Sequence, residues 1–406
     1  MGIWLALLGI ALLTLPQLAA QTGPLNLPTN ASFTLTAGSA TVLALAAQSD
    51  GKVLVGGNFT HVNGSAQANL ARLNADGTRD TTWAATVNGI VRAIVILGSD
   101  VFIGGDFTTV NGATWNRLAK LSLSNGALDA GWNPNASGTV NALATDGSYL
   151  FVGGAFTTFT GGTRNRLARF TLPGGALDSW NPNASNTVSA LAVSDSHVYV
   201  GGTFTTLSGS TRNRLGRFGL STGALDAWHP NSNGNVNALV ITPAHVYAGG
   251  PFTSVSFNNR NRLCRFARSD GLLDLTWDPN AGGVGTAVNA LGAGGTHLYA
   301  GGNFTTFGVT PRNRLARFAF ADGALDSQWN PNASNNVNTL DDGQSCFCRG
   351  LLRHHGRAGA KPLRRLSHHR RCQRQPRRSP PDSPPRSMSL AAPRPRSASL
   401  QPARLR

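Results

Sequence analysis

The sequence predicts an all-β protein assembled from a repeat of about 48 residues, and two observations support this prediction. A Gly-Gly pair followed by x-Phe-Thr occurs six times at nearly even spacing. The first glycines of the pairs are Gly56, Gly104, Gly153, Gly201, Gly249 and Gly301, at offsets of 48, 49, 48, 48 and 52 residues. All 18 acidic residues are Asp and only three residues are Lys, whereas surface helices normally draw on Glu and Lys. One array of strands is therefore expected along most of the chain.

Each copy of the repeat divides into four short segments with strand character. In the third copy these segments are residues 140–144, 149–153, 167–172 and 177–180. Turn signals such as Asp146-Gly147 separate them. Continuous apolar runs such as Leu150-Phe151-Val152 indicate strands covered on both faces, as where sheets pack face to face. Four turn-bounded strands per copy favour a β-propeller of four-stranded blades over a solenoid, which is the competing architecture.

The motifs also resemble known repeat families. The pattern Gly-Gly-x-Phe-Thr-Thr after an apolar strand resembles kelch-like propellers. Its fuller form, with Asn-Arg-Leu-Ala-Arg-Phe from Asn165 and Trp-Asn-Pro-Asn from Trp180, is similar to the delta-60-type β-propeller repeats of secreted bacterial proteins. The resemblance covers residues from about 41 to 340 and is weakest in the first copy, where Asn69-Leu70 lacks the intervening Arg. It implies a propeller fold and a secreted location, without a common activity.

The N-terminal segment is predicted to be a secretory signal. Residues 2–18 are almost uninterrupted apolar residues, and small residues precede a cleavage site expected after Ala20. An uncleaved anchor is the alternative, although the apolar stretch is short for a membrane span. Residues 21–40 are expected to be a connector, in which residues 32–36 form a strand that closes the ring by pairing with the last repeat. The propeller is assigned to residues 41–340, in a secreted or periplasmic monomer with no membrane span after cleavage.

Residues 341–406 are expected to be a disordered basic tail. They hold 16 Lys and Arg against 3 Asp, a net charge of +13, whereas residues 1–340 carry 19 basic and 15 acidic residues, a net charge of +4. An authentic tail of this kind would bind nucleic acid or anionic surfaces. A shifted reading frame is the other explanation, and under it the charge does not indicate a nucleic-acid partner.

The genetic code supports the shifted frame. The codons for residues 346–350, taken one base later, permit Val-Phe-Val-Gly-Gly, and those for residues 361–366 permit Asn-Arg-Phe-Ala-Ala-Phe. Arg349 lies 48 residues beyond Gly301, which is the period of the repeat. We therefore hypothesise that a one-base frameshift near Asp341 replaces a seventh blade, so that about six blades of an expected seven are encoded in frame. This predicts a gap or an exposed edge beside the first repeat.

Three residue types recur once in every copy or nearly so, and we interpret them as architectural. The Asp series is predicted to bond turn amides, the Arg series to pair with Asp or with carbonyls of a neighbouring blade, and the Trp series to pack between blades. The series are Asp80, Asp129, Asp178, Asp226, Asp274 and Asp326; Arg117, Arg166, Arg214, Arg262 and Arg314; and Trp83, Trp132, Trp180, Trp228, Trp277 and Trp329.

A few residues depart from this regularity and are the candidates for ligand contact. Trp115 stands where other copies have Arg, and we expect it to be exposed. His197, His245 and His297 stand four residues before the Gly-Gly pair of three successive copies. They suggest zinc, but equivalent positions on adjacent blades lie too far apart to share an ion unless they line the axis, so solvated strand ends are expected. Cys264 is expected to be a buried free thiol.

These patterns favour a binding or scaffold module over an enzyme. No catalytic residue, cofactor or metal site is predicted, because catalysis needs one asymmetric constellation and the polar residues here repeat. The expected partner is a glycan or a surface protein, held by the loops or by the axial channel. The alternative is a secreted hydrolase or lyase that uses Asp and His on one rim.

Overall fold

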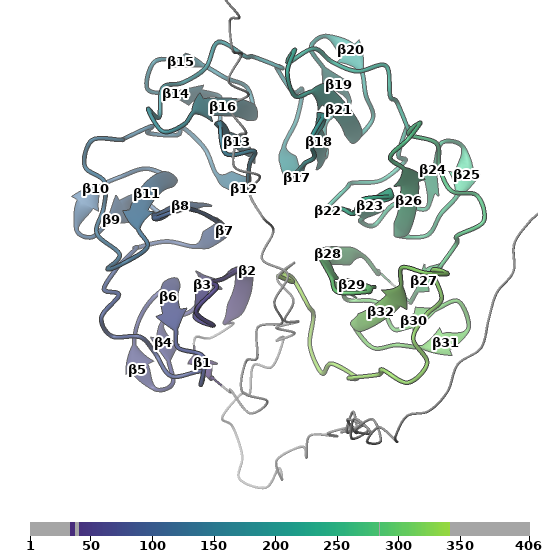
Figure 1. The fold of residues 1–406 in the computed structure, drawn as a ribbon, viewed down its shortest axis with the longest axis horizontal. Helices are drawn as coiled ribbons and strands as arrows, with labels where there is room; N and C mark the ends of the chain where they lie inside the picture. The colour runs from purple at the N-terminus through teal and green to yellow at the C-terminus, as the bar shows by residue number, and fades with distance from the viewer. Residues whose placement is uncertain (1–32, 37–39, 284, 342–406) are drawn as a thin grey trace, which may run out of the picture. The chain divides into compact units, whose positions relative to one another are not determined.

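The computed structural model describes residues 33–36, 40–283 and 285–341, and the predicted signal peptide and basic tail lie outside these residues. Six antiparallel sheets are arranged around a common axis, as Figure 1 shows. We call them blades 1 to 6 in chain order. The six in-frame blades of the predicted all-β propeller are therefore confirmed. No described helix is long and apolar enough to cross a membrane.

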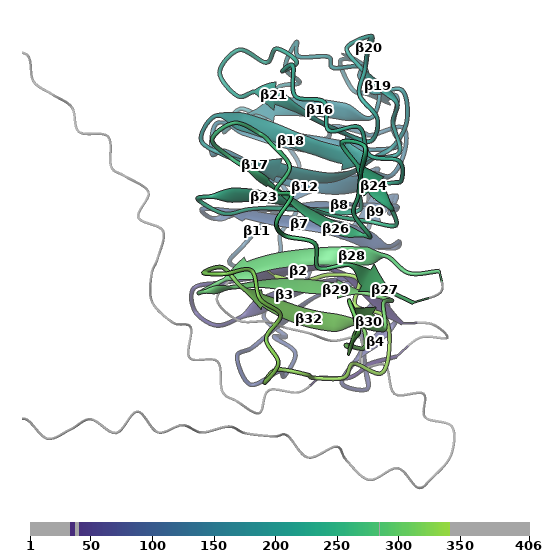
Figure 2. The ribbon, with the colours of Figure 1, turned by 90° about the vertical axis from the view of Figure 1, so that its right-hand side faces the viewer.

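Each blade has three main strands. From the axis outward they are β2 (Thr41–Ala47), β3 (Val53–Asn58) and β6 (Leu70–Leu73) in blade 1; β7 (Val91–Leu97), β8 (Asp100–Gly105) and β11 (Leu118–Ser122) in blade 2; β12 (Val140–Thr145), β13 (Tyr149–Gly154) and β16 (Leu167–Thr171) in blade 3; β17 (Val188–Val193), β18 (His197–Gly202) and β21 (Leu215–Gly219) in blade 4; β22 (Ala238–Ile241), β23 (His245–Gly249) and β26 (Leu263–Ala267) in blade 5; and β28 (Val288–Gly294), β29 (His297–Gly302) and β32 (Leu315–Ala319) in blade 6. Seen edge-on, strands such as β2, β3, β28 and β29 run along the ring axis (Figure 2).

The predicted fourth strand is reduced to a single bridge in each blade. In blade 3 this bridge pairs Phe170 with Leu177. A short hairpin that the sequence analysis did not assign connects the second and third main strands. The hairpins are β4 (His61–Val62) with β5 (Ser65–Ala66), β9 (Thr109–Val110) with β10 (Ala113–Thr114), β14 (Thr158–Phe159) with β15 (Gly162–Thr163), β19 (Thr206–Leu207) with β20 (Ser210–Thr211), β24 (Ser254–Val255) with β25 (Asn258–Asn259), and β30 (Thr306–Phe307) with β31 (Thr310–Pro311).

The strand predicted to close the ring has a different partner. β1 (Leu35–Thr36) pairs with β4 of the first repeat, with Leu35 opposite Val62, and not with the last repeat. The segment β27 (Ala281–Gly282) pairs with β30 of blade 6 in the same way. The segment before a blade therefore packs on that blade's own hairpin, because the chain enters each blade beside it. The expectation for residues 32–36 is corrected accordingly.

The Gly-Gly pair is required by two close approaches. A Cβ added at Gly153 would lie 2.5 Å from Cγ1 of Val188, the first residue of the next inner strand. A Cβ at Gly154 would overlap the carbonyl oxygen of Thr139, beside a register shift between Val140 and Ala142. The same Val-on-Gly contact occurs after every blade. The motif thus lets one blade settle directly against the next.

Apolar side chains from successive blades fill the spaces between them. Leu54 and Leu70 of blade 1 pack with Val101 and Ile103 of blade 2. Cores of the same kind join the blades in order up to blade 6. The burial on both faces predicted from the continuous apolar runs is explained by these contacts, since odd and even positions of one strand face different neighbouring blades.

Residues 337–341 occupy the place of an inner strand of a seventh blade. Val337 packs on Gly301, and its N–H donates to the carbonyl of Gly302 over 3.1 Å, as Val288 donates to Gly250 over 3.3 Å. At the other end, the Asp341 carboxylate accepts a hydrogen bond of 2.9 Å from the N–H of Ala47 in β2. In Figure 1 this segment returns to the axis between blades 6 and 1.

We predict that Gly153→Ala destabilises the propeller by about 1–3 kcal/mol, because the added methyl group overlaps Val188. Urea unfolding followed by circular dichroism measures this change. Gly174→Ala is the matched control, since a Cβ there meets nothing within 4 Å. Equal stability of the two variants would show that the interface between blades accommodates the added methyl group without a loss in the free energy of unfolding.

Candidate functional site

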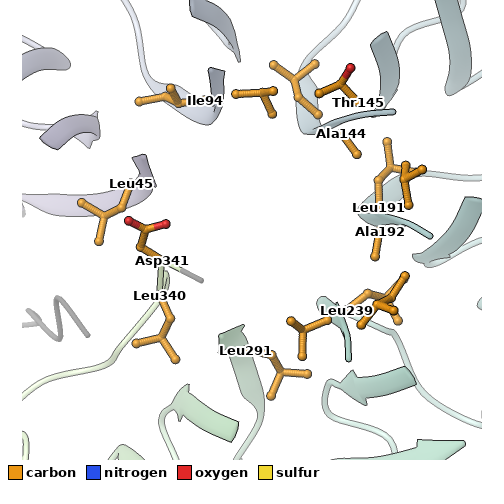
Figure 3. A pocket seen from close by; sticks show the side chains of 15 residues that line it. Leu45, Ile94, Ala144, Thr145, Leu191, Ala192, Leu239, Leu291, Leu340 and Asp341 are labelled. Atoms are coloured by element: carbon orange, nitrogen blue, oxygen red, sulfur yellow. The ribbon is translucent and has the colours of Figure 1, made fainter. Parts of the chain in front are cut away.

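The axial channel is the feature of the ring with the clearest capacity for a ligand. A cavity of about 380 Å³ lies at its centre and includes a belt of seven equivalent side chains, six of which stand three residues after a valine that packs on glycine. The belt consists of Leu45, Ile94, Leu143, Leu191, Leu239, Leu291 and Leu340. Figure 3 shows Leu340 and Asp341 between Leu291 of blade 6 and Leu45 of blade 1. The belt is therefore sevenfold although only six blades are described.

Polar side chains lie beside this leucine belt in the channel. The channel there holds a second hollow of about 160 Å³, lined in part by Ser189, Asn237, Asn289 and Asn338. Each of these residues directly follows the valine of its copy. The side-chain amide N–H of Asn237 in blade 5 donates a hydrogen bond of 3.2 Å to the side-chain carbonyl oxygen of Asn289 in blade 6. Amides and a hydroxyl from four consecutive positions thus line part of one end of the channel.

A non-repeating polar cluster occurs at the same position of the repeat in blade 2. Arg92, which follows Val91, forms an ion pair of 2.7 Å with Asp106. The hydroxyl of Thr139 in the next copy donates to the other carboxylate oxygen over 2.6 Å. Burial favours the neutral acid, but the bonds from Arg92 and Thr139 outweigh it and hold the pKa of Asp106 below its ordinary value. Asp106 is therefore ionised at neutral pH and suits binding better than proton donation.

The repeated Asp residues have the predicted architectural role. Asp178 accepts from the N–H of Trp180 over 2.8 Å and from Arg169 over 2.8 Å, and its counterparts bond turn amides in the same way. Burial would raise the pKa of Asp178, but these donors outweigh it and lower that pKa. In blade 5, the bonds from Thr276 and Arg265 lower the pKa of Asp274 to about 2 despite its burial. All these carboxylates accept hydrogen bonds that hold the turns of the blades.

The repeated Arg series joins neighbouring blades, as predicted. Arg166 has a positive φ of 64° and donates to the carbonyl of Ala184 over 3.0 Å, in the segment that leads into the next blade. Arg117, Arg214, Arg262 and Arg314 make the equivalent bond. The Asp series is paired instead by the second Arg of the motif, such as Arg169, or by Lys120 in blade 2.

The Trp residues of blades 1 to 5 pack against the following blade, which confirms the prediction for these five. The Trp132 ring meets Phe102 and Phe170 edge-on, with centroids 5.6 and 5.5 Å away. Its indole N–H donates to the carbonyl of Gly175 in the turn of blade 3 over 2.7 Å. Such aromatic pairs contribute about 0.5–1.5 kcal/mol beyond their buried area.

Trp115 is not exposed, so that expectation is wrong. Its side chain is 8% exposed, and its indole N–H donates to the carbonyl of Trp132 over 3.1 Å. In the third copy Arg164 occupies the same position and donates to the carbonyl of Asp178. The indole replaces the guanidinium as a donor to the outer segment of the blade, which explains its burial. Ligand contact by Trp115 has no support from its position.

The three His residues lie in separate blades, at the starts of β18, β23 and β29. Each is half-buried beside a tyrosine two residues on. His197 Nε2 lies 3.7 Å from Asp226, and His297 Nε2 lies 4.0 Å from Asp326. Burial, with the charges of Arg217 and Arg265, lowers the pKa values of His197 and His245. Within the described part of the chain no His, Cys and Asp side chains gather into a metal-binding group.

Two further features bear on the predictions. Cys264 is a buried free thiol, as expected, and burial raises its pKa.

Blade 5 carries another hollow, of about 410 Å³, beside Trp228 and Leu272. The hairpin residue Phe257 is 89% exposed with a positive φ of 62°, at a position where earlier copies have glycine. The fifth copy thus departs from the others.

The channel residues were missed because they follow no catalytic or metal-binding motif. Arg92, Asn237 and Asn289 could have been found from one signal, the polar residue that directly follows the valine of its copy. Asp106 and Thr139 carry no such signal, since their pairing depends on how two blades are rotated against each other.

Comparison with known proteins supports the fold. Five segments match a family model described as "Domain of unknown function (DUF5122) beta-propeller". The matched residues are 48–82, 101–131, 145–179, 194–227 and 297–328, so the fifth copy is not matched. No curated protein matches the sequence.

Solved propeller structures are similar at low sequence identity. One chain of the mitotic checkpoint complex has a TM-score of 0.51 at 14% identity, over 84% of this chain and 92% of that one. The WD40 β-propeller domain of Doa1 has a TM-score of 0.49 at 13% identity, over 77% and 90%. The extracellular domain of a putative one-component system from B. thetaiotaomicron has a TM-score of 0.49 at 18% identity, over 76% of this chain but 37% of that one. At these identities the likeness concerns the fold alone.

The lowered pKa values of the Asp series predict acid sensitivity. A carboxyl whose pKa is lower in the folded state stabilises the fold above the unfolded pKa of about 3.9, and this contribution is lost as the pH falls through that value toward the folded pKa. We expect the unfolding midpoint in urea to be constant from pH 7 to about pH 5 and to fall steeply below about pH 4.

The variant Asp178→Asn tests this origin. It should cost about 1–2 kcal/mol at pH 7, because charged hydrogen bonds are lost, and should reduce the loss of stability between pH 5 and pH 3. Asp50→Asn, at an exposed turn, is the matched control for net charge. An unchanged pH profile in Asp178→Asn would assign the acid sensitivity to other groups.

Proposed function

We propose that the protein is a secreted binding module that holds the end of a glycan chain in the polar end of its axial channel. The observation that carries this proposal is the arc of amides and hydroxyls, from four consecutive positions, beside the leucine belt. Amide and hydroxyl groups donate and accept, which suits a neutral ligand rich in hydroxyls, and the belt can cover the apolar face of a sugar ring.

The state of the titratable groups favours binding over catalysis. The Asp series is ionised and bonded to turn amides, and Asp106 is paired with Arg92. A glycosidase of the usual kind needs a protonated carboxyl and a second carboxylate at a set separation. His197 lies beside Asp226, which Arg217 already binds. The position of His197 therefore contributes to the structure of the blade. The hydrolase alternative therefore needs a residue pair that the described channel does not offer.

A panel of soluble glycans tests the proposal, with affinity measured by calorimetry and turnover by analysis of the products. The double variant Asn237→Ala/Asn289→Ala should weaken binding at least tenfold, because it removes polar groups at the site. Ser210→Ala, on the exposed hairpin of blade 4, should bind as the parent does.

The outcomes separate the alternatives. Product release would identify a hydrolase or lyase. Binding that the channel variant leaves unchanged would move the site elsewhere on the ring, and a failure of all glycans to bind would point to a protein partner instead.

A further inference from the structure

The face of blade 6 that points toward the next blade is less covered than the same face of the other blades. We call it the forward face of blade 6, and it comprises Tyr299 and Trp329. Tyr299 is half-buried, whereas the residues at its position in blades 1 to 5 are at most 2% exposed. These residues are Leu54, Phe102, Phe151, Tyr199 and Tyr247. On the opposite side of this junction, Val53 and Val55 of blade 1 are buried with Phe33 and Leu35, so the predicted exposed edge lies on blade 6.

The tryptophan of blade 6 also differs from its counterparts. Each of the other five indole N–H groups donates to a carbonyl in the outer turn of the following blade, over 2.7 to 3.1 Å. The acceptors are those of Ser122, Gly175, Gly223, Gly271 and Gly323. The Trp329 indole has no such acceptor among the described residues, although Arg317 lies 5.0 Å from its ring centroid and Tyr299 lies 5.6 Å away.

Residues 337–341 already lie where the first strand of a further blade would be. Val337 packs on Gly301 and Leu340 completes the leucine belt, so the chain enters the next position of the ring in the geometry of the other blades. What this position lacks, in the described chain, is the two outer main strands with their hairpin and the outer turn.

The turn that meets each Trp imposes a specific requirement. Gly323 has a positive φ of 72°, and a Cβ there would lie 2.5 Å from Cδ1 of Trp277. Gly175, with a φ of 69°, and Gly271, with a φ of 77°, are confined in the same way by Trp132 and Trp228. A partner for Trp329 must therefore present a glycine in the left-handed region and a free carbonyl beside it. Few apolar surfaces meet both conditions, whereas every outer turn from blade 3 to blade 6 does.

We propose that the forward face of blade 6 and the segment at residues 337–341 form an acceptor site for one occupant, a polypeptide that carries the two outer main strands and the outer turn of this same repeat. The first of its two main strands pairs with residues 337–341, and its apolar face covers Tyr299. Its turn glycine accepts the hydrogen bond of Trp329. The five described junctions supply the template for this fit.

The test uses the full chain and a synthetic peptide of residues 145–183, which begin at the last residue of the equivalent inner strand in blade 3. Binding is measured by calorimetry, and the contact surface by hydrogen exchange. We expect saturable binding with new protection in β29 and β32. The peptide with Gly175→Ala should bind at least tenfold more weakly, because its methyl group overlaps the Trp329 ring.

A covalent version keeps the test decisive if the peptide self-associates. In this chain, residues 145–183 replace the sequence after Asp341, and the same graft with Gly175→Ala is the control. The first graft should melt at a higher temperature than the full chain and the second should not. The proposal is overturned if neither format binds or stabilises, or if the glycine and alanine forms behave alike.

Discussion

The contact of a valine in one blade with a glycine in the blade before it determines the rest of the ring. Val188 fits against Gly153 because no side chain lies between them, and the same contact follows each blade. Close packing of this kind tolerates little extra volume, so it fixes the separation and rotation of neighbouring blades. The belt in the channel follows directly, since every belt residue except Leu45 stands three positions after such a valine.

A second set of contacts, farther from the axis, joins the same pairs of adjacent blades. Asp178 orders the turn that carries Trp180, Arg169 binds that Asp, and its guanidinium lies 5.4 Å from the Trp ring centroid. The indole then donates to Gly223 of the next blade. One network thus links a turn within a blade to the adjacent blade. This explains why Asp, Arg and Trp recur together and why their recurrence does not mark a catalytic site.

The sequence allowed the blades and the roles of the Asp, Arg and Trp series to be predicted, because both depend on contacts repeated at a fixed spacing. The predicted pairing of residues 32–36 with the last repeat was wrong, because the partner of a short strand is decided by where the chain enters the blade. The exposure of Trp115 was wrong because an indole can replace an arginine as a buried donor. The bond between Asn237 and Asn289 could not be predicted, as it joins residues 52 positions apart through the rotation of two blades.

The sevenfold belt follows from the first contact. If each valine sets the same rotation between successive blades, the number of blades that closes the ring is a property of the repeat, whatever the number encoded. Leu340 takes the seventh position and Asp341 reaches Ala47 of β2, so the rotation left after six blades corresponds to one more inner strand. Closure at six would require a different angle at every Val-Gly contact. In the described part of the chain the ring instead keeps its angle, and residues 337–341 take the seventh position along the channel.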